Sequence, residues 1–268
     1  MTAKLGIIGG GVMAEALLSR LISRGTHQAQ DVWVSEPLPS RRDFLAQQYG
    51  IHATGDNQAV VAEVDVLLLA IKPQVFQSVV DALMPPAAAS EQLVISILAG
   101  VSIQKLEAAF PGQPVIRTMP NTPATIGAGM TAITPGHQAN PNHVQIAQQI
   151  FAAVGEVVEV PESMMDAVTG LSGSGPGYVA VMIEALIDGG VAAGLPRAIA
   201  TQLAIQTVRG TAELLQTQSL HPAVLKDRVT SPGGTTIAGI AHLEQAGFRS
   251  AIIEAVRAAY RRSQELGR

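Results

Sequence analysis

The feature that most constrains the fold is a regular alternation of short apolar runs with helical patterns over the first 160 residues. Residues 66–69 and 94–97 are apolar without alternation, which is typical of strands covered on both faces. Helical patterns lie between the runs, including residues 14–23, 41–49 and 74–84. The alternation predicts an α/β fold with a doubly wound parallel sheet. We expect its strands at residues 5–8, 31–35, 64–71, 93–98, 115–119, 130–134 and 156–160.

The pattern changes after residue 161, where helices alone are predicted. Ser163 and Asp166 fit a capping box that opens a helix. Apolar residues then recur at helical spacing from Tyr178 to Leu186, and further helices are expected over 196–215, after Thr236 and over 248–266. Small residues at 189–194 permit close helix packing, and a unit of this kind often buries surface against a second copy. The sequence thus predicts two domains, 1–160 and 161–268, the second all-helical.

Composition excludes several classes of function. Of the 268 residues, 47% are hydrophobic and 14% are charged, so a core is easily filled. A net charge of −4 without blocks of like charge argues against nucleic acid and anionic membrane surfaces. The chain has no cysteine, and its six histidines show no metal-ligand spacing, so we expect no metal. A strand pattern that begins by Leu5 leaves no room for a signal peptide, and we expect a soluble, cytoplasmic protein.

A glycine-rich turn follows the first predicted strand and opens a helix. Gly9, Gly11 and Ala14 match the G-x-G-x-x-G/A pattern. Gly9 permits a tight turn, Gly11 lets the backbone approach a pyrophosphate, and Ala14 permits packing of the helix on the strand. In this setting the turn predicts a dinucleotide site. A purely structural turn, or a regulatory domain without nucleotide, remains the alternative.

The choice of coenzyme is read at the end of the second strand, where Ser35 and Glu36 precede Arg41 and Arg42. An acid there favours NAD, whereas a hydroxyl with arginines favours the 2′-phosphate of NADP. Because Ser35 lies nearer the strand tip, we favour NADP and keep NAD as the alternative. The alternative is that the two arginines belong to a solvated first helical turn.

Other candidate residues lie where strands end, at the edge that borders the ligand crevice of open α/β sheets. Lys72 follows the central strand and is either close to the coenzyme or a surface lysine. Asn57 either faces the adenosine side or caps a helix. The proline-rich loop at 117–123 either borders the nicotinamide or is simply stiff.

A second turn rich in glycine lies at residues 226–239, more than two hundred residues after the first. Four hydroxyls, two glycines and a proline fall between Thr230 and Thr236, and a helix is predicted to follow. Such a turn exposes backbone N–H groups and binds anions. Two anion-binding turns indicate two ligands, one of them a small carboxylate.

These motifs together resemble the pyrroline-5-carboxylate reductase family, almost from end to end. The resemblance rests on residues 9–14, 70–73, 117–123, 166–176 and 225–239. It implies a Rossmann-type domain followed by an all-α dimerisation domain that forms an interlocked dimer, often as five dimers in a decamer. It also implies that the substrate binds between the nicotinamide of one subunit and a helical domain of the dimer.

The resemblance also assigns roles to individual positions. The implied substrate-binding residues are Glu162, Ser231, Gly234, Thr235 and Thr236. The implied cofactor-binding residues are Ile8, Gly9, Gly10, Gly11, Val12, Met13, Ser35, Asn57, Ala70, Ile71, Lys72, Pro73, Leu98, Ala99, Met119 and Asn121. Glu36, beside Ser35, puts a strict preference for NADPH in doubt.

The implied reaction is hydride transfer from NADPH or NADH to the cyclic imine 1-pyrroline-5-carboxylate, which gives L-proline. Its protonated iminium accepts hydride readily, so orientation matters more than a strong acid. We expect Ser231 and the N–H groups near Gly234 and Thr235 to hold the carboxylate. Thr236 is the catalytic candidate: it would hydrogen-bond the ring nitrogen, with relay of its proton as a further hypothesis.

Two other classes stay open at this point. A β-hydroxyacid or related imine dehydrogenase shares the two-domain plan but relies on a catalytic lysine in the helical domain. Lys226 is the only lysine after Lys105, which weighs against that class. The other alternative is a non-catalytic dimer that senses NAD(P).

Overall fold

The computed structural model describes residues 3–83 and 91–267. These residues form two compact units. The first contains the described residues up to Ser174 together with those from Ala258 onward, and the second contains Gly175–Arg257.

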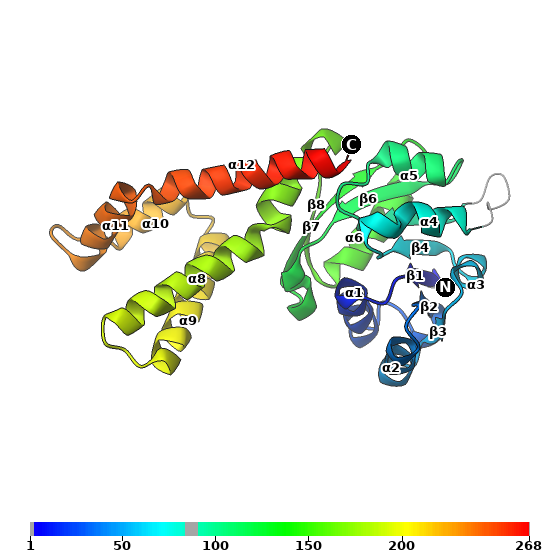
Figure 1. The fold of residues 1–268 in the computed structure, drawn as a ribbon, viewed down its shortest axis with the longest axis horizontal. Helices are drawn as coiled ribbons and strands as arrows, with labels where there is room; N and C mark the ends of the chain where they lie inside the picture. Colours follow the sequence, from blue (N-terminus) through cyan, green and yellow to red (C-terminus); the bar gives the residue numbers. More distant parts are fainter. Residues whose placement is uncertain (1–2, 84–90, 268) are drawn as a thin grey trace. The chain divides into compact units, whose positions relative to one another are not determined.

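The first unit is built on an eight-stranded sheet of order β3-β2-β1-β4-β5-β6-β7-β8 (Figure 1). Neighbouring strands are parallel except β6 and β7. The strands are β1 (Leu5–Ile8), β2 (Val32–Ser35), β3 (His52–Thr54), β4 (Val66–Leu69), β5 (Leu93–Ser96), β6 (Val115–Met119), β7 (Gly129–Pro135) and β8 (Gly155–Glu159).

The predicted α/β sheet is confirmed, with two differences. The strand β7 runs antiparallel to β6 because only residues 120–128 join them, and a parallel crossover needs a dozen residues or more. The edge strand β3 was not predicted, since three residues are too few to show an alternating pattern.

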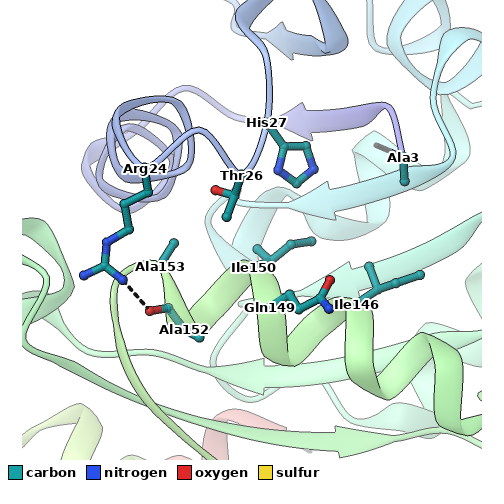
Figure 2. A pocket seen from close by; sticks show the side chains of 9 residues that line it. All are labelled: Ala3, Arg24, Thr26, His27, Ile146, Gln149, Ile150, Ala152 and Ala153. Atoms are coloured by element: carbon teal, nitrogen blue, oxygen red, sulfur yellow. Dashed lines mark hydrogen bonds between the residues drawn. The ribbon is translucent and has the colours of Figure 1, made fainter. Parts of the chain in front are cut away.

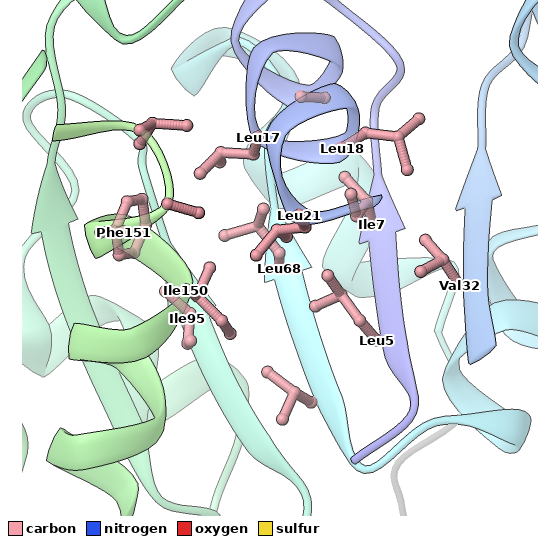
Figure 3. Packing of buried hydrophobic residues seen from close by; sticks show 14 of the residues in the cluster. Leu5, Ile7, Leu17, Leu18, Leu21, Val32, Leu68, Ile95, Ile150 and Phe151 are labelled. Carbon is pink, nitrogen blue, oxygen red and sulfur yellow. The ribbon is translucent and has the colours of Figure 1, made fainter. Parts of the chain in front are cut away.

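Helices cover both faces of the sheet, and successive strand residues therefore point into two different cores. The helices of this unit are α1 (Val12–Ser23), α2 (Pro39–Tyr49), α3 (Asn57–Glu63), α4 (Phe76–Asp81), α5 (Ile103–Ala109), α6 (Pro141–Ala152) and α7 (Met165–Val168). One core joins Ile7 and Leu68 to α1 and α6 through Leu17 and Phe151 (Figure 3). The other gathers residues of α3, α4 and α5, among them Val60, Phe76 and Leu106, against the opposite face.

Two predicted helix starts differ from the structure. No side chain caps the segment at Ser163, which forms a short 3-10 turn at Glu162–Met164 before α7. The predicted capping box is therefore wrong, because the carboxylate of Asp166 accepts a hydrogen bond from the distant Ser263 instead. Helix α4 follows a 3-10 turn at Pro73–Val75, and residue 84, the predicted end of this helix, lies outside the described residues.

The second unit is helical, as predicted. It contains α8 (Gly175–Ala192), α9 (Arg197–Gln218), α10 (Pro222–Arg228), α11 (Thr235–Gln245) and the first half of α12 (Phe248–Gly267). Helix α8 packs against α9, yet only Ala200 and Ala204 of these two helices are buried. Large apolar side chains such as Val181 and Leu203 remain more than half exposed. Within the described residues, no helix is both long and apolar enough to cross a membrane.

Candidate active site

The glycine-rich turn lies at the carboxyl end of β1, between the ends of β2 and β4. The N–H of Gly9 donates to the carbonyl oxygen of Ser35 (2.8 Å), and the N–H of Ala70 donates to that of Ile8 (2.9 Å). Gly9 has φ +100°, and a Cβ there would lie 2.6 Å from the carbonyl oxygen of Ala70. Only glycine therefore fits this position.

The start of α1 offers an open approach for an anion. Gly11 is the N-cap residue, no side chain caps the helix, and a Cβ on Gly11 would meet no atom within 4 Å. The partial positive charge and backbone N–H groups of a helix N-terminus bind phosphate. The structure thus gives Gly9 and Gly11 the geometry that a dinucleotide turn requires.

The Glu36 carboxylate accepts hydrogen bonds from backbone N–H groups in and near the glycine turn. Its Oε2 accepts the N–H of Gly10 at 2.9 Å and its Oε1 accepts the N–H of Leu38 at 3.0 Å, and the residue is 9% exposed. From the sequence alone, this acid was considered only as a feature that favours NAD. The contact spans 26 residues of sequence, and no local pattern reveals it.

Both arginines after β2 also bind the backbone around the turn. Arg41 donates from Nε to the carbonyl oxygen of Gly10 (2.8 Å) and pairs with Glu15 (2.5 Å). Burial acts to raise the pKa of Glu15, but hydrogen bonds from Arg41 and Tyr49 and the charge of Arg41 outweigh it and leave that pKa below its ordinary value. Arg42 donates to the carbonyl oxygens of Glu36 and Pro37. Both arginines thus lie in the first turn of α2, half-buried, with their guanidinium groups hydrogen-bonded to the backbone rather than simply solvated.

The structure brings Ser35 and Asn57 together, although 22 residues separate them. The Ser35 hydroxyl donates to Asn57 Oδ1 at 2.6 Å. Asn57 is the first residue of α3 and does not cap it, because Asp56 accepts the N–H groups of Gln58 and Ala59. A hydroxyl and an amide thus meet beside the glycine turn.

The remaining predicted cofactor positions occupy the ends of β4, β5 and β6. Residues 70–73 follow β4, where Lys72 is exposed, and Leu98 is buried after β5. Asn121 donates from Nδ2 to the Ser172 carbonyl oxygen and accepts the Met130 N–H on Oδ1. Its amide therefore also orders the segment between β6 and β7.

Glu162 forms a partly buried ion pair that sequence reasoning missed. Its Oε1 accepts from Arg117 (2.8 Å) and from the N–H of Ile103 (3.0 Å), while Oε2 is buried without a hydrogen-bond partner among the described residues. Arg117 lies in β6 and its side chain is 7% exposed. The pair joins β6, the start of α5 and the segment before α7.

The second glycine turn lies in the helical unit, between α10 and α11. The N–H of Gly234 donates to the Ser231 carbonyl oxygen (3.0 Å), and Gly233 has φ +68°. A Cβ on Gly234 would clash with the Ser231 hydroxyl oxygen. Gly234 is the N-cap of α11, and no side chain caps this helix either.

The hydroxyls of this turn are not equivalent. Thr230 Oγ1 donates to the carbonyl oxygens of Lys226 and Asp227 and so completes the end of α10. Thr235 and Thr236 form the exposed first turn of α11, beside the exposed Ser231. Uncapped N–H groups and three hydroxyls therefore surround one helix start, which suits a small carboxylate.

A separate hollow of about 510 Å³ lies in the first unit, beside the residues that precede β1. Figure 2 shows His27 and Ile150 among its lining residues, with Arg24 hydrogen-bonded to the Ala152 carbonyl oxygen. His27 is 9% exposed, and its Nδ1 has no hydrogen-bond partner in the described part of the chain. Burial lowers the pKa of His27, and the charge of Asp31 offsets this only in part.

We expect His27 to make the protein less stable in mild acid. Because the pKa of His27 is lower in the folded than in the unfolded chain, the unfolded chain binds more protons below about pH 6.5. Stability should then fall as pH drops below 6.5, by at most about 1.4 kcal/mol per pH unit for this one proton. Urea unfolding of wild type and His27→Leu from pH 5 to 8 measures the difference in slope. Equal slopes would contradict the prediction.

The Rossmann-type sheet, the glycine turn and the helical unit define the class of protein, an NAD(P)-dependent oxidoreductase with a helical second unit. Residues 162–266 match the family model for pyrroline-5-carboxylate reductase dimerisation, and residues 4–100 match that for F420-dependent NADP oxidoreductases. The chain belongs to the pyrroline-5-carboxylate reductase family.

Three relatives illustrate the similarity. The pyrroline-5-carboxylate reductase of Synechocystis is 61% identical over the full length of both chains. The solved structure of the reductase from Coxiella burnetii has a TM-score of 0.90 at 32% identity and covers 100% of both chains. The Plasmodium falciparum enzyme, solved with NADP bound, has a TM-score of 0.90 at 31% identity and covers 99% of this chain and 98% of its own.

Proposed function

We propose that this chain reduces 1-pyrroline-5-carboxylate to L-proline with a hydride from NADPH, the last step of proline biosynthesis. The observation that carries the proposal is that one chain has two uncapped helix starts, each after a glycine turn, at α1 and at α11. The first suits a pyrophosphate and the second a carboxylate. Family membership supports this pairing of ligands.

Residues 1–160 would bind the coenzyme, and residues 161–268 would bind substrate and dimerise. Because Gly9 and Gly11 have no side chains, the space beside the turn is open to a pyrophosphate. A methyl group at Gly11 would occupy part of that space. Ser35 and Asn57 would hold the adenosine end, and residues 70–73, Leu98 and Ala99 would line the rest. The coenzyme, when bound, supplies the hydride. The NADP in the Plasmodium structure supports NADPH as the donor.

Replacement of Glu36 should lower the affinity for NADPH and for NADH to a similar extent. Its carboxylate holds the N–H groups of Gly10 and Leu38, so it acts on the turn that both coenzymes would share. We therefore expect Glu36→Ala to weaken NADPH and NADH binding by similar factors and to change their ratio less than about threefold. Titration of both coenzymes by nicotinamide fluorescence measures this. A tenfold shift of the ratio towards NADPH would instead show a direct contact between Glu36 and the ribose.

The turn before α11 would hold the substrate. The N–H groups near Gly234 and Thr235 and the Ser231 hydroxyl would bind its carboxylate, and Thr236 would hydrogen-bond the ring nitrogen. Hydride then adds to the imine carbon of the iminium, on the side of the nitrogen away from the carboxylate-bearing carbon, and the C=N bond becomes a C–N single bond as its π electrons move to the nitrogen. Substrate contact by Glu162 remains a prediction, since its Oε1 is already engaged with Arg117 and Ile103.

Self-association fits the exposed apolar helices of the second unit. None of the residues in α8, α10 or α11 is buried, and a dimer would cover apolar faces of this kind. We propose an interlocked dimer, with five dimers forming a decamer, in the cytoplasm. Sedimentation velocity measures the species, and a monomer at micromolar concentration would contradict this part of the proposal.

The test of function is an assay of purified protein with NADPH and 1-pyrroline-5-carboxylate. Loss of nicotinamide absorbance together with formation of L-proline is the expected result. A β-hydroxyacid with oxidised coenzyme tests the dehydrogenase alternative in parallel. Coenzyme binding without turnover of either substrate would indicate a sensor and overturn the enzymatic proposal.

A further inference from the structure

The C-terminal end of α12 is anchored in the nucleotide-binding unit. Ser263 is 4% exposed, and it is the one residue of α12 that is buried. Its hydroxyl donates to Asp166 Oδ1 in α7 at 2.6 Å. A buried hydroxyl bound to a carboxylate fixes this end of the helix more specifically than apolar contact would.

The last turn of α12 lies against the loop between β5 and α5, residues 97–102. Gly100 has φ +75°, and a Cβ there would lie 3.3 Å from the carbonyl carbon of Leu266. A Cβ on Gly267 would in turn lie 3.2 Å from the carbonyl oxygen of Gly100. The two segments are therefore in backbone contact, and glycine on each side permits it.

Lys105 joins the two segments through a hydrogen bond. Its Nζ donates to the carbonyl oxygen of Gly267 at 2.7 Å. Carbonyl groups in the last turn of a helix lack intrahelical partners and carry partial negative charge, so an ammonium group there is favourable. Lys105 is itself fixed at its backbone, because its N–H donates to Ser102 Oγ at the start of α5.

The nucleotide-binding unit also holds this loop on either side of Gly100, since Ile97 donates its N–H to the Leu69 carbonyl oxygen and Val101 is buried in the second core. At one end, Leu98 is buried and donates its N–H to Ser96 Oγ; at the other, the N–H of Ile103 is held by Glu162. Between these points, Gly100 is in contact with the end of α12. Ala99 and Leu98 are the loop residues that would line the coenzyme.

We propose that the last turn of α12, with Lys105, positions the Leu98–Gly100 loop for coenzyme binding. The inference rests on the proposed function, because it takes this loop to line NADPH. Leu266, Gly267 and Lys105 are positioning residues and need not touch the coenzyme. Loss of their contacts leaves the loop to be ordered by the ligand, which lowers affinity.

The test uses the full-length enzyme and two kinds of variant. Lys105→Met removes the donor, and a chain that ends at Gln264 removes its acceptor while leaving Lys105 and its charge in place. We expect the Kd for NADPH to rise about threefold in the first and about three- to tenfold in the second. The KM for 1-pyrroline-5-carboxylate and kcat at saturating NADPH should stay within about twofold.

Two matched variants show whether the loss of affinity comes from the lost hydrogen bond, from the lost positive charge or from misfolding. Lys105→Arg keeps a donor and should restore affinity. Arg262→Met removes a cation from an exposed ion pair of the same helix end and should change nothing. The inference is overturned if the shortened chain binds NADPH like wild type, or if Arg262→Met weakens binding as much as Lys105→Met. A loss of kcat with unchanged Kd would also overturn it, since the contacts would then act on the chemical step and not on coenzyme binding. Wild type that fails to bind NADPH at all would instead refute the proposed function.

Discussion

Gly9→Ala is expected to destabilise the protein and to abolish measurable NADPH binding. A residue with a Cβ is strained at φ +100°, and the added methyl group would lie 2.6 Å from the carbonyl oxygen of Ala70. The turn between β1 and α1 must then shift away from the end of β4. We expect a loss of about 2–4 kcal/mol in unfolding free energy and an increase in Kd of about 100-fold or more, equivalent to about 2.8 kcal/mol.

Gly11→Ala is the matched control, since it separates folding from coenzyme binding. Its methyl group would meet no protein atom within 4 Å, and the backbone at Gly11 has φ −70°, which any residue adopts. The Tm should therefore change by no more than about 1 °C, whereas NADPH binding should weaken about tenfold or more, because the methyl group occupies the approach to the pyrophosphate. Thermal unfolding and fluorescence titration on both variants give the two readouts.

The two variants can fail in different ways. Wild-type affinity in Gly11→Ala would show that the pyrophosphate does not approach this turn. An unchanged Tm in Gly9→Ala would show that the turn tolerates the methyl group and that the tight fit to Ala70 is not essential. Either result would contradict one of the two predictions, on coenzyme affinity or on stability, without affecting the other.

Much of the fold was predictable because its determinants are local. The apolar residues of Leu5–Ile8 and Val66–Leu69 identify strands without reference to anything distant, and Gly9 and Gly11 mark the turn by their spacing alone. The direction of β7 was not predictable from the pattern of its own residues. It depends on the length of the connection from β6, and the predicted strand ends at residues 119 and 130 already leave too short a connection for a parallel crossover.

The side-chain contacts of the site were less predictable, since they join segments far apart in sequence. Glu36 returns to Gly10 across 26 residues, Arg117 meets Glu162 across 45, and Ser263 meets Asp166 across 97. From local sequence, Glu36 is simply an acid after a strand, and Asp166 is an acid near a helix start. Each was therefore given a local role, Glu36 as an acid that favours NAD and Asp166 as part of a capping box.

Side-chain contacts are also hard to predict from sequence within the second glycine turn, residues 230–236. The residue pattern predicts that Thr230 to Thr236 form a hydroxyl-rich turn before a helix, and only the family resemblance distinguishes its hydroxyls. The structure assigns Thr230 to the carbonyl oxygens of α10 and leaves Thr236 exposed at the start of α11. These two threonines therefore provide a test of which hydroxyl serves chemistry.

Thr236→Val is expected to lower kcat/KM for 1-pyrroline-5-carboxylate by about 10- to 100-fold. Valine keeps the shape and the β-branch but removes the hydroxyl proposed to hydrogen-bond the ring nitrogen. A hydrogen bond to a charged group contributes about 1.5–3 kcal/mol, which corresponds to that range. Steady-state kinetics at saturating NADPH measures the loss, and Thr236→Ser, which retains a hydroxyl, should recover most of it.

Thr230→Val is the matched control, because it removes a hydroxyl from the same turn with a different expected effect. It breaks the hydrogen bonds to the carbonyl oxygens of Lys226 and Asp227 and should lower the unfolding free energy by about 1 kcal/mol. Its kcat/KM should stay within about threefold of wild type, and the Kd for NADPH should be unchanged in both variants. Equal losses of kcat/KM in the two variants would mean that the turn acts through its shape alone. In that case the iminium would need no hydroxyl from this protein, and orientation by the carboxylate-binding N–H groups would account for the substrate's reactivity.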